Sequence, residues 1–212
     1  MRDQTQRWAD SFERELTGIL ALQSDIARGL AASLALTLLP TEQQRLYNAF
    51  LHAFNGTDLL FERRWNDAIG ELRTALKMSP GLPLAANPLI AALHMKGSYA
   101  EALDALKTYA GIMGYVEVEE ILQRSGASEE YRQTMRQAAD ALAARSRHTF
   151  VSRYDIVMFY TYAEERDRAF EWIENGIKAR DPNLPYLGEP DFELLHGDPR
   201  FRAVMRRLNL PR

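Results

Sequence analysis

The histidines are the side chains best suited to acid–base or metal chemistry, and they are scattered along the chain. His52, His94, His148 and His196 lie far apart, and none belongs to a His-Glu-x-x-His pair that would hold a zinc ion. His148 and Asp155 are near enough in sequence to form an acid–base pair, so a hydrolase that uses them is one hypothesis. The interpretation that we favour is a solvated loop histidine beside an aspartate at a helix start.

Other signals of catalysis are missing from the sequence. The chain has no cysteine, which excludes disulfides, thiolate nucleophiles and cysteine-based zinc or iron–sulfur sites. Glu117, Glu119 and Glu120 form a cluster, but acidic residues at a helix start ordinarily complement the helix dipole. No glycine-rich phosphate-binding loop occurs. We therefore expect no enzymatic activity, no metal site and no cofactor.

Charge argues against nucleic acid as a partner. The net charge is -3 and the pI is about 5.9, so no global field attracts nucleic acid or an anionic membrane. A group of arginines near the C-terminus lacks aromatic residues interleaved to stack on bases, and we interpret it as the solvated face of a capping helix. These arginines are Arg200, Arg202, Arg206, Arg207 and Arg212.

Hydropathy indicates a soluble protein. The most apolar run, Gly29 to Leu39, is about half of the roughly 20 residues that cross a bilayer. The first residues, Met1 to Arg14, are strongly polar and lack the apolar core of a secretory signal. We therefore expect no membrane span and a cytoplasmic location.

The elements that would position a binding site are helices, and two helical pairs repeat. The motif W-x-x-A-x-x-x-L that begins at Trp65 recurs as Y-x-x-A-x-x-x-L at Tyr99, 34 residues later. This period is the signature length of tetratricopeptide repeats (TPRs), each of which is a helix–turn–helix unit. Gly56 is predicted to lie where the two helices of the first repeat approach closely, because it has no side chain.

The predicted fold is all-α, a TPR-like helix–turn–helix solenoid with a long N-terminal helix and a C-terminal capping helix. Residues 1–40 form an amphipathic helix that packs on the array, residues 41–180 form the repeats, and residues 183–212 form the cap. The repeats cover residues 49–82, 83–115, a degenerate 116–149 and 150–182. Helices are predicted at residues 6–39, 41–61, 66–78, 84–96, 99–110, 116–122, 128–145, 152–163, 168–179 and 199–208.

Two segments resemble parts of bacterial multidomain signalling proteins. Residues 6–27, with Trp8 and Phe12, resemble the junction that follows a TolB-N-terminal-like α/β domain and leads into TPRs. The segment from Val151 to Phe201, with its D-R-A-F-E-W motif, resembles the last repeat and cap of the same family. The resemblance implies sensory or protein-binding repeats attached to adenylate cyclases, kinases or winged-helix regulators, with no catalytic residue. Since the α/β domain and the effector are missing here, we expect a fragment or a stand-alone relative.

Candidate binding residues follow from the geometry of stacked repeats. The first helix of each repeat lines the inner surface, and in this chain its inward positions are rich in aromatic residues and methionine. Both residue classes are enriched in protein interfaces, and the amide of Asn87 could bond a peptide backbone. The predicted partner-binding residues are Phe50, Phe61, Asn87, His94, Tyr154, Met158 and Tyr162.

The function predicted from the sequence is therefore non-catalytic protein binding. A peptide or helix of a partner protein would lie in a concave groove of the repeats, in bacterial signalling or regulation. The alternative is a scaffold for homo-oligomerisation, in which the apolar face of residues 6–39 pairs with a second copy to give a homodimer.

Overall fold

A computed structural model of the chain describes residues 40–125 and 130–209. The chain divides into two compact units, Met1–Asn48 and Ala49–Arg212. The predicted helix over residues 6–39 lies outside the described residues. In the first unit, the described part is the beginning of α2 (Pro40–Phe61), where the side-chain amide of Gln44 donates to Asn48 Oδ1 at 2.9 Å.

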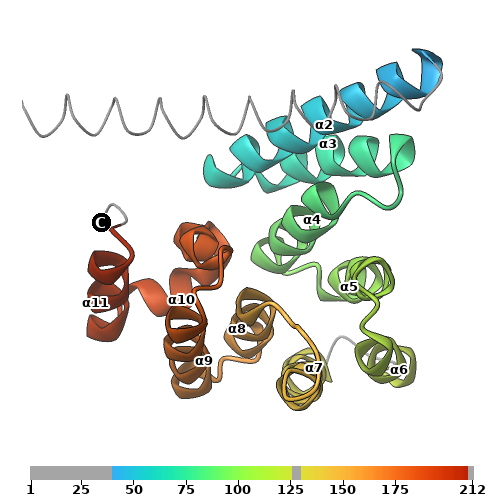
Figure 1. Cartoon of the computed structure of the whole chain (residues 1–212). Helices are drawn as coiled ribbons and strands as arrows, with labels where there is room; N and C mark the ends of the chain where they lie inside the picture. The colour runs from blue at the N-terminus through green and yellow to red at the C-terminus, as the bar shows by residue number, and fades with distance from the viewer. Residues whose placement is uncertain (1–39, 126–129, 210–212) are drawn as a thin grey trace, which may run out of the picture. The chain divides into compact units, whose positions relative to one another are not determined.

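All regular secondary structure in the described residues is helical, which confirms the all-α class (Figure 1). From α3 to α9, each helix packs against the next one in the chain. The helices are α3 (Trp65–Met78), α4 (Pro83–Lys96), α5 (Tyr99–Met113), α6 (Val116–Arg124), α7 (Tyr131–Arg145), α8 (Arg153–Tyr162) and α9 (Arg166–Ala179).

The predicted helix over residues 99–110 is too short at its C-terminal end. Helix α5 continues through Gly111 to Met113 and ends at Gly114, which has a φ of 67°. The backbone N–H of Gly114 points toward the carbonyl oxygens of Ala110 and Gly111, as expected for a left-handed glycine that ends a helix. The second glycine therefore ends the helix, because it alone takes the left-handed conformation.

The close approach predicted at Gly56 is confirmed. A Cβ atom at Gly56 would lie 2.5 Å from Leu72 Cγ and 3.3 Å from the carbonyl oxygen of Ala68, both in α3. Ala49 and Ala53, on the same face of α2, are fully buried. Small residues at these positions let the backbones of α2 and α3 come together.

Helix α8 lies in the interior of the second unit. All nine of its residues from Tyr154 to Tyr162 are buried, including Asp155 and Thr161. A helix that is buried on every side must satisfy its polar groups within the protein. In α8 this is achieved largely by hydrogen bonds between tyrosine hydroxyls and carboxylates.

The C-terminal segment packs against α4 and α8 as well as against the preceding helix α9. It contains the 3-10 helices η2 (Leu184–Gly188) and η3 (Pro190–Phe192), followed by α10 (Glu193–His196) and α11 (Pro199–Arg207). Helix η2 contacts α8 and α9, η3 contacts α4, and α11 contacts α9. The last helix buries one apolar face, formed by Phe201, Val204 and Met205.

Candidate ligand-binding site

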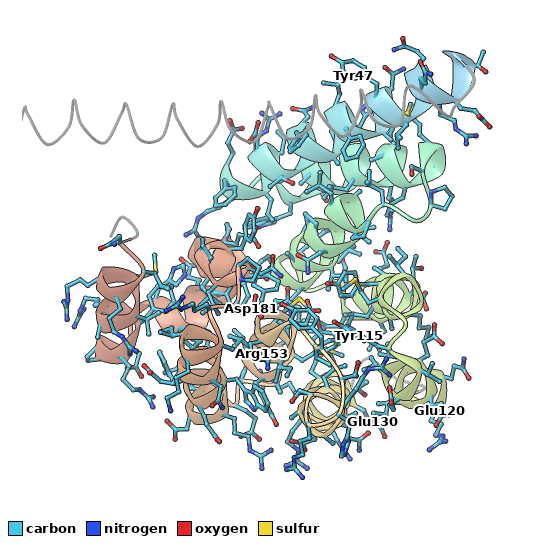
Figure 2. The ribbon with its side chains drawn as sticks, viewed as in Figure 1. Tyr47, Tyr115, Glu120, Glu130, Arg153 and Asp181 are labelled. Atoms are coloured by element: carbon cyan, nitrogen blue, oxygen red, sulfur yellow. The ribbon has the colours of Figure 1, made fainter. Side chains whose placement is uncertain are left out.

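Asp181 fixes the start of the C-terminal segment beside the first turn of α8. Its Oδ2 accepts hydrogen bonds from the backbone N–H of Arg153 at 2.6 Å and from the hydroxyl of Ser152 at 3.3 Å. Its Oδ1 accepts the backbone N–H of Asn183 at 2.9 Å. Figure 2 shows Asp181 and Arg153 together at α8. Asp181 thus caps α8 and holds the following segment against it.

Two tyrosines of α8 bind two carboxylates of that segment. The hydroxyl of Tyr154 donates to Glu189 Oε2 at 2.8 Å, and the hydroxyl of Tyr162 donates to Asp191 Oδ2 at 2.7 Å. Burial raises the pKa of both carboxyl groups, and the charge of Asp191 raises that of Glu189 further. The other oxygen of Asp191, Oδ1, is buried and makes no hydrogen bond within the described residues. An unbonded buried carboxylate oxygen is costly, so a hydrogen bond to Oδ1 would stabilise the ionised form of Asp191.

Aromatic rings form a wall beside Asp191. The rings of His94 and Tyr162 stack at 3.9 Å between centroids with an interplanar angle of 9°. The ring of Tyr131 stacks with both His94 and Tyr99, at centroid distances of 5.7 Å and 4.5 Å. The Tyr131 hydroxyl is 3.1 Å from His94 Nδ1. Burial lowers the pKa of His94 to about 4, so its imidazole is neutral at pH 7.

A cavity of about 580 Å³, the aromatic pocket, opens next to this wall. Its volume falls within the range of sites for small ligands and single side chains. The exposed Glu164 and Glu193 are paired with Arg132 at 2.5 Å and with Arg63 at 2.6 Å. The lining residues are His94, Met95, Tyr99, Tyr131, Arg132, Thr161, Tyr162, Glu164, Asp191, Glu193 and Leu194.

Two of the predicted binding residues, His94 and Tyr162, line the aromatic pocket. Three others meet one another in the interior. The Tyr154 hydroxyl lies 3.3 Å from Asn87 Oδ1, and the Asn87 amide nitrogen lies 3.5 Å from Met158 Sδ. Tyr154 and Met158 are buried, and the Tyr154 ring packs edge-on against Phe192. The chain's own C-terminal segment therefore covers this part of the predicted inner surface.

The two predicted residues of α2 lie elsewhere. Phe50 is half-buried and packs against the hydrophobic core. Phe61, the last residue of α2, is exposed and does not line the aromatic pocket. The structure therefore brings five of the seven predicted residues together along α4 and α8, and leaves the two α2 residues apart.

Sequence reasoning missed three important residues of the pocket: Tyr99, Tyr131 and Asp191. Tyr99 is recognisable as the aromatic of the repeat motif, which favours a packing role. Tyr131 begins a helix assigned to the degenerate repeat. Asp191 follows a proline in the C-terminal segment, where an aspartate is typical of an exposed turn. Nothing in its local sequence indicates burial.

The structure gives Asp155 partners other than His148. Its Oδ1 accepts the Tyr109 hydroxyl at 2.8 Å and its Oδ2 the Tyr115 hydroxyl at 2.6 Å, and Tyr115 is labelled in Figure 2. Burial raises the pKa of Asp155 to about 6, while the two tyrosines act in the opposite direction. His148 is exposed. Asp155 is therefore part of the interior hydrogen bonding of α8.

Residues 40–125 and 130–209 contain no group of three or more histidine, aspartate and glutamate side chains placed to hold a metal ion. Within the same residues, no helix is both long enough and apolar enough to span a bilayer. Comparison of the chain with protein-family models, curated proteins and solved structures found no match. The aromatic pocket is therefore interpreted from its own residues.

Proposed function

We propose that the chain is a TPR-like helical array that binds a peptide or helix of a partner protein, without catalysis, at the aromatic pocket. The observation that carries this proposal is the pocket itself, a cavity of about 580 Å³ lined by aromatic rings with a few polar groups. Aromatic residues and methionine are enriched where proteins bind one another. The proposal includes a role in signalling or regulation in the cytoplasm, which is the expectation drawn from the sequence of residues 151–201.

The position of the pocket supports binding on the inner face of the repeats. His94 belongs to α4 and Tyr162 to α8, which are the first helices of two predicted repeats. The inner face near Asn87 and Tyr154 is covered by the C-terminal segment. Binding is therefore concentrated at one opening, which favours a short segment with one or two anchoring side chains over a long extended peptide.

Selection of short peptides from a displayed library tests this function. Peptides enriched on the wild type would be measured on Tyr99→Ala and on Phe61→Ala. Tyr99 is 37% exposed and lines the pocket, so its truncation removes ligand contact without opening the core. Phe61 is an exposed aromatic residue outside the pocket.

We expect the enriched peptides to bind Tyr99→Ala at least about tenfold more weakly, which corresponds to about 1.4 kcal/mol, and to bind Phe61→Ala unchanged. Equal affinity for Tyr99→Ala, or the failure of any peptide to be enriched, would contradict binding at the pocket.

Self-association is a second candidate function, favoured by an apolar face of α2. Leu51 and Phe54 are one helical turn apart, and they are 50% and 40% exposed. Exposed apolar side chains that gather on one face mark interaction surfaces. Light scattering on the wild type and on Leu51→Glu/Phe54→Glu is expected to show a homodimer that becomes monomeric in the variant. A monomeric wild type would exclude this candidate.

A further inference from the structure

The charges around the aromatic pocket are balanced except at one residue. Glu164 is paired with Arg132, and Glu193 is paired with Arg63. Asp191 accepts a hydrogen bond from a neutral tyrosine, and within the described part of the chain no lysine, arginine or histidine forms an ion pair with it. The pocket therefore contains one carboxylate whose negative charge the protein leaves uncompensated.

The carboxylate of Asp191 has one oxygen without a hydrogen-bond partner in the described residues, which a hydrogen-bond donor of a ligand could fill. It is 3% exposed and lines the pocket, so its carboxylate has little access to solvent. The Tyr162 hydroxyl fixes Oδ2 at 2.7 Å, and Oδ1 has no partner. An ionised carboxylate only accepts hydrogen bonds, so Oδ1 leaves Asp191 with an unused acceptor in the wall of the pocket. A charged donor would form the stronger, charge-assisted bond and would offset the burial of the negative charge.

The rest of the pocket suits the stem and head of a long cationic side chain. Met95, Leu194 and the Tyr99 ring provide apolar surface for methylene groups, which lysine and arginine commonly pack along such surfaces. The rings of Tyr99 and Tyr131 stack at 4.5 Å, and aromatic rings attract cations that come within about 6 Å. Because burial lowers the pKa of His94 to about 4, the aromatic wall carries no positive charge at pH 7.

We propose that the aromatic pocket binds a lysine or arginine side chain of the partner peptide, with its cationic group bonded to Asp191 and its stem packed against Tyr99 and Tyr131. This inference rests on the proposed function and names the ligand chemistry of the same site. An apolar ligand side chain would leave the buried charge of Asp191 without a counter-charge, and an acidic ligand side chain would be repelled by it. The pocket therefore selects by charge as well as by shape.

A set of matched peptides tests this preference. Each is capped at both ends and carries one central residue between glycines: lysine, arginine, norleucine or Nε-acetyl-lysine. Norleucine keeps an apolar stem without the ammonium group, and Nε-acetyl-lysine keeps the length without the charge. n-Butylammonium serves as a free amine. Binding is followed by amide chemical shifts of the isotope-labelled full chain, with Asp191→Asn and Asp140→Asn as variants.

The two variants are matched. Asp191→Asn keeps an oxygen that can accept the Tyr162 hydroxyl, but it removes the charge. Asp140 also accepts a tyrosine hydroxyl, from Tyr160 at 2.6 Å, but it is exposed on α7 and does not line the pocket. If Asp191→Asn does not fold, as judged by circular dichroism, the wild-type comparison of lysine with norleucine decides the question alone.

The lysine or arginine peptide is expected to bind at least about tenfold more tightly than the two neutral peptides, through one charge-assisted hydrogen bond. This preference is expected to disappear in Asp191→Asn and to persist in Asp140→Asn. Norleucine binding as tightly as lysine, a preference unchanged in Asp191→Asn, or no binding by the set would each overturn the inference. Library peptides that still bind at the pocket would then leave the proposed function standing. If n-butylammonium binds as tightly as the lysine peptide, the peptide backbone contributes nothing to affinity, and this result would exclude a peptide as the ligand.

Discussion

Replacing Asp155 with asparagine measures what a buried charge in α8 costs the fold. Asp155 is 1% exposed, and among the described residues its carboxylate accepts side-chain hydrogen bonds only from the hydroxyls of Tyr109 and Tyr115. Burial raises its pKa from 3.8 to about 6, because the two hydroxyls offset only part of the lost hydration. Each pH unit between the folded and unfolded pKa is worth about 1.4 kcal/mol. Ionisation of Asp155 at pH 7 therefore costs about 3 kcal/mol of the free energy of folding.

The direction of the pH effect on stability depends on whether the folded or the unfolded chain holds the Asp155 proton more tightly. Between pH 3.8 and about 6, the folded chain keeps a proton on Asp155 that the unfolded chain has released. The stabilisation is therefore fully present below about pH 4 and is lost as the pH rises through 6. Asp155→Asn has no such proton, so the variant should gain on the wild type by about 2 kcal/mol between pH 4 and pH 7. Glu189 and Asp191, whose pKa values are also raised by burial, give a slope that both proteins share.

Urea unfolding at a series of pH values gives the difference directly. Asparagine can accept one tyrosine hydroxyl and donate to the other, so any change in hydrogen bonding adds an offset that does not vary with pH. Asp140→Asn, at an exposed site that also bonds a tyrosine, is expected to change the free energy of unfolding by less than about 1 kcal/mol. A difference between Asp155→Asn and the wild type that stays constant or shrinks as the pH rises would refute the reasoning.

Other substitutions test the packing and the hydrogen bonds around the site. Gly56→Ala should lower the free energy of unfolding by about 1–3 kcal/mol in urea, because its Cβ would lie 2.5 Å from Leu72 Cγ. Gly70→Ala, with no atom within 4 Å of the new Cβ, should raise it by up to about 1 kcal/mol, and equal changes would contradict the packing. Asp181→Ala should cost about 1–2 kcal/mol in thermal unfolding through loss of the α8 cap, whereas wild-type stability would exclude that role. Tyr162→Phe should cost about 1–3 kcal/mol at pH 7, because a buried carboxylate loses its donor, and an unchanged urea midpoint would contradict this hydrogen bond.

The helices were predictable because their signals are local. Apolar residues at spacings of three and four, together with glycine and proline at the ends, define the helical spans. Gly56 was also predictable, because the predicted repeat places it opposite the following helix. The end of α5 was harder to predict, because Gly111 and Gly114 are both plausible stops, and only the backbone conformation identifies Gly114.

The candidate site was only partly predictable, because it depends on contacts between distant parts of the chain. The predicted repeat geometry identifies His94 and Tyr162, and both residues line the pocket. It does not place Asp191, which reaches the pocket when the C-terminal segment packs against α4 and α8. The same packing buries Tyr154 and Met158, which repeat geometry alone would leave open to a ligand.

The hydrogen bonds that hold the C-terminal segment also build the site. The bond from Tyr154 to Glu189 and the capping of α8 by Asp181 place the segment beside α8. The bond from Tyr162 then fixes Asp191, which lines the aromatic pocket. Substitutions at Tyr154 or Asp181 should therefore weaken ligand binding indirectly, although neither residue lines the pocket.

Amide chemical shifts of the isotope-labelled protein, recorded with a peptide enriched from the library, test most directly whether the aromatic pocket is the binding site. Binding at the pocket predicts the largest changes at Tyr99, Tyr131 and Asp191, with little change at Leu51 and Phe54 of α2. Changes confined to α2, or changes that leave the lining residues of the pocket unaffected, would contradict it.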